Sequence, residues 1–165
     1  MTKTTEPTAQ VDKMISASTA AIWTALTTPS MLKQFFFGAD VTTDWKVGNP
    51  IRMKGEYNGK AYEDKGEIMT FQPARQLSFS HWSAMSGQPD IPENYRLVTF
   101  DLVPDGGATK VTLSQANLMG GVTESDKSHR AEYEKNWASV LDGLAKVATS
   151  STARRNVRPT STRST

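Results

Sequence analysis

Apolar residues near the C-terminus recur at spacings of three and four, which is the repeat of one face of an α-helix. They are Tyr133, Trp137, Val140, Leu141, Leu144 and Val147. Thr123-x-x-Asp126 precedes them and resembles a capping box, with Asp in place of the usual Glu. The pattern therefore predicts a helix from Thr123 to Thr149, about 40 Å long at ~1.5 Å per residue. Only one face of this helix is apolar, so we expect it to cover a sheet.

The N-terminal part of the chain predicts a strand followed by two short helices. The strand is expected over Val11–Ala17, and Ser18 after it is a good N-cap. Pro29 suits the first position of the second helix and Gly38 suits its end. The apolar residues of the two helices are Ile22, Trp23 and Leu26, then Met31, Leu32, Phe35 and Phe36.

Between residues 41 and 117 the pattern changes to short strands separated by turn residues. Asn58-Gly59 is a strong signal for a two-residue hairpin. Asp105-Gly106-Gly107 marks another turn, and Pro73-Ala74-Arg75 interrupts the apolar runs on either side. About six closely spaced strands are expected here, and such spacing favours antiparallel pairing.

Several short motifs occur in an order that resembles a known family. They are Phe35-Phe36, Asp44-Trp45-x-x-Gly48, Gly55-x-x-x-Gly59-Lys60, Tyr62-Glu63-Asp64-Lys65-Gly66-x-Ile68, Gln72-Pro73-x-Arg75-x-Leu77, Thr109-x-Val111-Thr112-Leu113-x-Gln115 and Asn136-Trp137-x-x-Val140-Leu141-Asp142-Gly143-Leu144. Together they resemble the START-like (SRPBCC) superfamily and, within it, the activator of heat-shock-protein-90 ATPase homologue-like family. Phe35 departs from the family, which often has Trp there, and so does the arginine-rich tail.

The resemblance implies an α+β helix-grip fold. In this fold a curved antiparallel β-sheet wraps around a long C-terminal α-helix, with two short helices after the first strand. It also implies an internal cavity for a small molecule. It does not imply one activity, because the superfamily contains carriers, cyclases, hydrolases and co-chaperones.

Charge and composition divide the chain into a body and a basic tail. The net charge is +2, and Thr149–Thr165 carries four arginines and no acid, so the rest of the chain carries −2. A nucleic-acid-binding domain would have a basic face on its body, so we expect no nucleic-acid partner. The sequence predicts a disordered N-terminus over residues 1–8, one domain over 9–149 and a disordered basic tail over 150–165.

Several classes of site and location are excluded or disfavoured by composition. The chain has no cysteine, which excludes disulfides, thiolate zinc sites and cysteine nucleophiles. Its two histidines, His81 and His129, lie on different predicted elements, so no metal site and no cofactor are expected. Met1–Gln10 is polar, with no signal-peptide core, and no apolar run is long enough to span a membrane. A cytoplasmic location is therefore expected.

Strand alternation predicts which residues face the cavity, because successive side chains point to opposite faces. Leu77 and Phe79 share their face with His81, and the inward faces of the later strands include Arg96 and Gln115. The expected ligand-binding residues are His81, Arg96, Gln115, Phe79, Met53, Phe100, Tyr133 and Trp137.

For some of these residues a structural interpretation is also open. His81 is also consistent with a structural role or a position at the rim of the cavity. Arg96 is consistent with a position at the cavity mouth, where its head would reach water. Gln115 is consistent with a bridge to the final helix. Trp137 is more typical of a core than of a ligand platform. The charged run Glu63–Glu67 is interpreted as a solvated hairpin surface.

Three functions remain open from the sequence. The favoured one is a protein that binds a small apolar or amphipathic molecule and releases it unchanged, with no catalytic residue. The second is an enzyme acting on aromatic or polyketide-like compounds, with His81 as general acid or base; the strand registers supply no acidic partner for it. The third is a module that regulates a chaperone ATPase in the stress response, which would need a protein partner. Monomer and homodimer both remain open.

Overall fold

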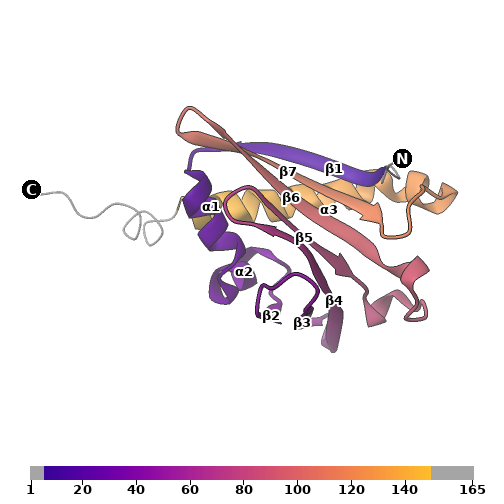
Figure 1. The fold of residues 1–165 in the computed structure, drawn as a ribbon. Coiled ribbons are helices and arrows are strands. Elements are labelled where there is room, and N and C mark those ends of the chain that lie inside the picture. Colours follow the sequence, from indigo (N-terminus) through magenta and orange to yellow (C-terminus); the bar gives the residue numbers. More distant parts are fainter. Residues whose placement is uncertain (1–5, 150–165) are drawn as a thin grey trace, which may run out of the picture.

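A computed structural model describes residues 6–149 and shows one curved sheet with a long helix across its concave face (Figure 1). The seven strands are antiparallel neighbours in the order β1-β7-β6-β5-β4-β3-β2. In chain order the elements are β1 Pro7–Ile15, α1 Thr19–Leu26, α2 Pro29–Phe35, β2 Asp40–Thr43, β3 Pro50–Tyr57, β4 Lys60–Gln72, β5 Gln76–His81, the 3₁₀ turns η1 Ala84–Ser86 and η2 Pro92–Asn94, β6 Arg96–Asp105, β7 Ala108–Asn117 and α3 Glu124–Ala148. The predicted helix-grip fold is confirmed.

The caps and turns that the sequence indicated are present. The Ser18 hydroxyl accepts a hydrogen bond from the Ala21 backbone at 3.1 Å, which caps α1. At the start of α3, Thr123 and Asp126 form the reciprocal capping box. Asn58 and Gly59 both have positive φ, at 52° and 79°, and close the β3–β4 hairpin. Local chemistry therefore sets the ends of these elements.

The first strand begins earlier than expected. β1 starts at Pro7 rather than Val11, and Thr8, which the sequence analysis assigned to a disordered segment, is buried. The reason is a long-range contact, because the Thr8 hydroxyl donates a hydrogen bond to the Gln115 carbonyl on β7 at 3.2 Å. The disorder predicted for residues 1–5 and for the basic tail lies outside the described residues.

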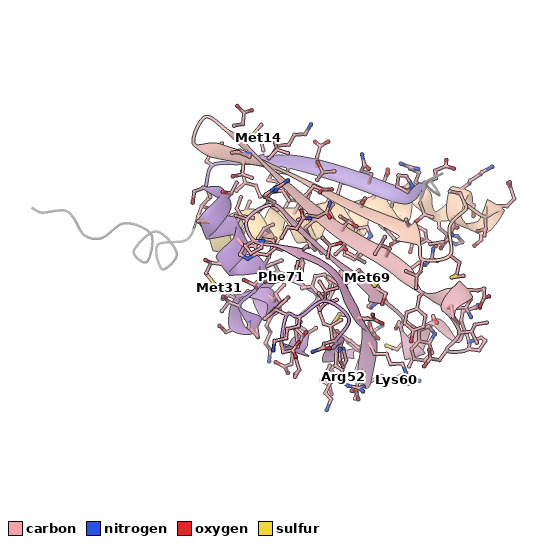
Figure 2. The ribbon with its side chains drawn as sticks, in the orientation of Figure 1. Met14, Met31, Arg52, Lys60, Met69 and Phe71 are labelled. Carbon is pink, nitrogen blue, oxygen red and sulfur yellow. The ribbon has the colours of Figure 1, made fainter. Side chains whose placement is uncertain are left out.

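The core lies between the concave face of the sheet and α3. Trp137, Val140, Leu141 and Leu144 face inward from the helix and are buried, as the spacing predicted. In Figure 1, α1 and α2 lie at the end of the sheet where α3 ends, and the start of α3 lies at the opposite end. Figure 2 shows Met14 on the outer side of β1, and Arg52 of β3 and Lys60 at the start of β4 projecting on the lower side of the view.

Gly143 allows α2 to contact α3 closely. A Cβ added there would lie 2.6 Å from the Phe35 Cβ, which is closer than carbon atoms approach. We therefore expect Gly143→Ala to destabilise the domain by about 1–3 kcal/mol, the usual cost of overpacking. The expected loss of stability is opposite in direction to the effect of helix propensity, which favours Ala over Gly by about 1 kcal/mol.

Urea unfolding of Gly143→Ala tests this close contact. Ser139→Ala is the matched control, because Ser139 is exposed on the same helix. It should leave the unfolding midpoint unchanged or raise it slightly. A midpoint for Gly143→Ala at or above that of the wild type would mean that the two helices do not approach this closely in solution.

Candidate functional site

A cavity of about 680 Å³ lies between the sheet, the first half of α3 and the loop that joins β5 to β6. Its apolar wall includes Phe36, Phe37, Met53, Val98 and Trp137. Polar side chains gather toward the start of α3 and the ends of β4, β5 and β6. This volume and mixture lie within the usual range for small-molecule sites.

The eight side chains expected from the sequence divide into two groups. His81, Arg96, Gln115, Met53, Tyr133 and Trp137 line the cavity. Phe79 and Phe100 lie outside it, buried in the core beneath Phe36, whose ring centroid is 6.1 Å from that of Phe79. Alternation identified the inward face correctly, but it cannot tell which inward positions the two short helices cover. That all six lining residues contact a ligand stays a prediction.

Gln115 joins the first strand to the last helix at the floor of the cavity. Its Oε1 accepts a hydrogen bond from the Trp137 indole at 2.8 Å, and its Nε2 donates to the Thr8 hydroxyl at 2.8 Å. The bridge to the final helix that the sequence suggested is therefore present. These bonds hold the amide in one orientation, and they fix the Trp137 ring as part of the wall.

Arg96 is tied to the start of the final helix. Its Nη1 donates to Asp126 Oδ1 at 2.9 Å and to Asn117 Oδ1 at 2.7 Å. Its guanidinium also lies over the Tyr133 ring, with the central carbon 5.6 Å from the ring centroid. The Arg96 side chain is 32% exposed, so the expected access to water remains, and what the sequence did not show is the capping carboxylate of α3 beside it. The positive charge of Arg96 is therefore balanced within the wall.

Asp126 makes the contacts that join the start of α3 to the sheet. Only 4% of its side chain is exposed. Burial raises the pKa of Asp126, but hydrogen bonds from the Thr123 backbone, Arg96 and Asn117 outweigh it and lower the pKa to about 2. The carboxylate therefore stays charged and holds the start of α3 on β6 and β7.

His81 has an acidic partner that the sequence analysis missed. Its Nε2 lies 2.9 Å from Asp64 Oδ2, and both side chains line the cavity. The interpretation of the charged run as a solvated surface is wrong for Asp64, whose side chain is 13% exposed. Alternation counted back from buried Ile68 puts Asp64 on the inward face, so this signal was available.

Gly66 permits the close approach of β4 and β5 beside this pair. A Cβ at Gly66 would lie 1.7 Å from the Ser80 carbonyl oxygen, so no other residue fits this backbone. Lys65 and Trp82 exchange backbone hydrogen bonds of 3.1 and 2.8 Å across the same point. The strands are thus held where the Asp64 side chain reaches His81.

The loop after β5 forms one side of the cavity mouth. Asp90 binds Lys65 and accepts a hydrogen bond from the Tyr95 hydroxyl at 2.6 Å. Burial, together with this bond and the Asp90 charge, raises the pKa of Tyr95 to about 12. The base of the loop is therefore pinned to β4, while Met85, Met119 and Phe37 present exposed apolar surface at the mouth.

The sequence model of the activator of Hsp90 ATPase homolog 1-like proteins (AHSA1) matches residues 16–149. The chain belongs to this family. No curated protein matches the AHSA1-like chain.

Solved structures repeat the fold of this AHSA1-like protein. ChR145 from Cytophaga hutchinsonii is 43% identical, with a TM-score of 0.68 over 84% of this chain and 90% of that one. CalU16 from Micromonospora echinospora is 21% identical, with a TM-score of 0.63 over 88% and 78% of the two chains. DynU16, a protein of the dynemicin biosynthetic locus, is 20% identical, with a TM-score of 0.66 over 84% and 45%. The last two likenesses concern the fold alone.

The described part of the AHSA1-like domain has neither a cluster of metal-binding side chains nor a membrane-spanning helix. Across residues 6–149, no three His, Asp or Glu side chains are grouped so that they could hold a metal ion. Within the same residues, no helix has the length and apolar character needed to cross a bilayer.

Proposed function

We propose that this domain binds a small amphipathic molecule in the cavity. The observation that carries the proposal is a space of about 680 Å³ with an apolar wall and a polar end that contains His81 and Asp64. An apolar portion of the ligand would contact Phe36, Met53 and Trp137. A polar group would be directed toward the His81 end. Such a division of the wall is typical of sites that orient one ligand by a few hydrogen bonds.

The bound molecule would enter between the β5–β6 loop and the start of α3. Phe37, Met85 and Met119 are more than two-fifths exposed there. Their apolar surface fits a ligand whose hydrophobic part passes the mouth first. The same surface would also suit a protein partner, such as the chaperone ATPase that the family's name indicates. An ATPase assay with that chaperone separates the two, because a carrier leaves its turnover unchanged.

Filling the cavity is expected to weaken ligand binding. Val98 is buried in the wall on β6, and Val98→Trp places a large ring in the ligand's space. We expect at least a roughly tenfold loss of affinity, which corresponds to about 1.4 kcal/mol. The measurement is a thermal-shift screen of amphipathic aromatic and aliphatic compounds, followed by calorimetry on the compounds that bind.

Val103→Trp is the matched control, since Val103 lies on the same strand and is exposed. It should leave the affinity unchanged. Equal affinity in both variants would place the ligand outside the cavity. A screen in which no compound raises the melting temperature of the wild type would contradict the proposal itself.

A further inference from the structure

The contact between His81 and Asp64 determines which ring nitrogen carries the proton. An ionised carboxylate only accepts hydrogen bonds, so the Nε2 that lies 2.9 Å from Asp64 Oδ2 must donate. In the neutral ring, Nδ1 is then the acceptor. Among residues 6–149, no group is hydrogen-bonded to His81 Nδ1, and the His81 side chain lines the cavity. The pair thus presents an unused proton acceptor on the cavity wall.

We propose that His81 and Asp64 form a proton-accepting dyad for a weakly acidic hydroxyl group, a phenol or an enol, on the bound molecule. This inference rests on the proposed binding function and names the chemical class of its ligand. The oxygen–hydrogen bond of the ligand breaks, the proton moves to His81 Nδ1, and the electron pair stays on the ligand oxygen. His81 Nε2 keeps its proton and its bond to Asp64. Return of the proton restores the ligand or, for an enol protonated on carbon, gives its ketone.

Asp64 is suited to the role of the orienting partner. Its side chain is largely buried, and its second oxygen, Oδ1, has no hydrogen-bond partner among the described residues. A buried carboxylate with one unsatisfied oxygen stabilises a neighbouring positive charge strongly, because little water screens it. The imidazolium formed by proton transfer would lie against this carboxylate.

None of the other charged groups that line the cavity, among the described residues, is placed to accept the ligand's proton as the dyad is. Arg96 is paired with Asp126 at 2.9 Å, so its charge is already balanced. Glu56 and Glu93 also line the cavity, and both carry negative charge. Of these groups, His81 is the one that can gain a positive charge and lie against a negatively charged ligand oxygen. This arrangement favours ligands that enter neutral and give up a proton inside.

A phenol and its methyl ether distinguish this dyad from simple apolar binding. The probes are 6-nitro-2-naphthol, whose ionised form absorbs visible light, and its methyl ether, which has no proton to give. The hydroxyl of this naphthol is less acidic than an imidazolium, so at neutral pH the free naphthol is mostly neutral while an ordinary imidazole is mostly unprotonated. Under these conditions we expect the wild type to bind the naphthol at least about tenfold tighter than the ether, the usual scale for a charge-assisted hydrogen bond. The visible band of the naphtholate should appear on binding.

His81→Gln and Asp64→Asn should both lose the visible band and the preference for the naphthol, while their affinity for the ether stays that of the wild type. The control is His129→Gln, because His129 is exposed on α3 and does not line the cavity. It should behave as the wild type does. Naphthol and ether bound equally well by the wild type would overturn the dyad but leave the binding function standing. If neither probe binds, the assignment of a phenol or enol ligand is overturned, and the thermal-shift screen described above decides the binding function separately.

Nitrogen-15 NMR of the ligand-free wild type gives a test that needs no variant. The neutral His81 ring should carry its proton on Nε2, with Nδ1 showing the chemical shift of an unprotonated nitrogen. A ring protonated on Nδ1 instead would overturn the assignment of Asp64 as the partner that orients His81.

Discussion

Trp137→Ala is expected to lower the free energy of unfolding by about 3–5 kcal/mol, the usual cost of deleting a large buried aromatic side chain. The Trp137 ring lies between α3 and the cavity, with its centroid 6.1 Å from Phe36 and 5.8 Å from Phe37. Its indole nitrogen also holds Gln115, so the variant loses packing and leaves a buried amide oxygen unpaired. For a domain of this size such a loss is a large part of the total stability.

Urea denaturation of Trp137→Ala and Trp137→Phe separates these two contributions. Trp137→Phe keeps most of the ring but cannot donate to Gln115, so we expect a smaller cost of about 1–3 kcal/mol. Asn136→Ala is the control, because Asn136 is the exposed neighbour on the same helix. It should stay within about 0.5 kcal/mol of the wild type. A Trp137→Ala midpoint close to that of the wild type would mean that the helix face is assigned wrongly.

The sequence was sufficient for the fold because most of its signals are local. The spacing of apolar residues fixed the buried face of α3, and Thr123 and Asp126 fixed its start. Asn58-Gly59 fixed a hairpin and therefore the register of β3 with β4. β1 was placed less well, because its first residues are ordered by pairing with β7, more than a hundred residues away.

The candidate site was only partly predictable because its key pairs join distant segments. Alternation along one strand placed His81 on the inward face, but its partner Asp64 lies on another strand within a charged run. The run suggested solvent, whereas only its odd-numbered residues Glu63, Lys65 and Glu67 lie on the face opposite to buried Ile68. The partner of Arg96 was missed for a similar reason, since no pattern along the chain shows that α3 begins beside it.

Asp126→Ala is expected to cost about 2–4 kcal/mol, because it removes the buried carboxylate that pairs with the half-buried Arg96 and caps α3. The variant also loses the capping box and the bond from Asn117, which together hold the start of α3. Glu124→Ala is the matched control, since Glu124 lies in the same helical turn but is almost fully exposed. It should cost no more than about 1 kcal/mol, through the helix dipole and the exposed ion pair of Glu124 with Lys127. Chemical denaturation at neutral pH measures both variants.

The dependence of stability on pH tests the charge of Asp126 separately from its shape. The pKa of Asp126 is lowered from 3.8 to about 2 in the folded protein, so folding favours the ionised form. The resulting stability is fully present above pH 4 and is lost as the pH falls toward 2, and it amounts to about 2 kcal/mol at 1.36 kcal/mol per unit. We expect the unfolding free energy of the wild type to fall more steeply over this range than that of Asp126→Asn, which has no proton to bind. Parallel curves for the two proteins would show that folding does not favour the ionised form of Asp126, and that its hydrogen bonds with Thr123, Arg96 and Asn117 do not depend on the charge.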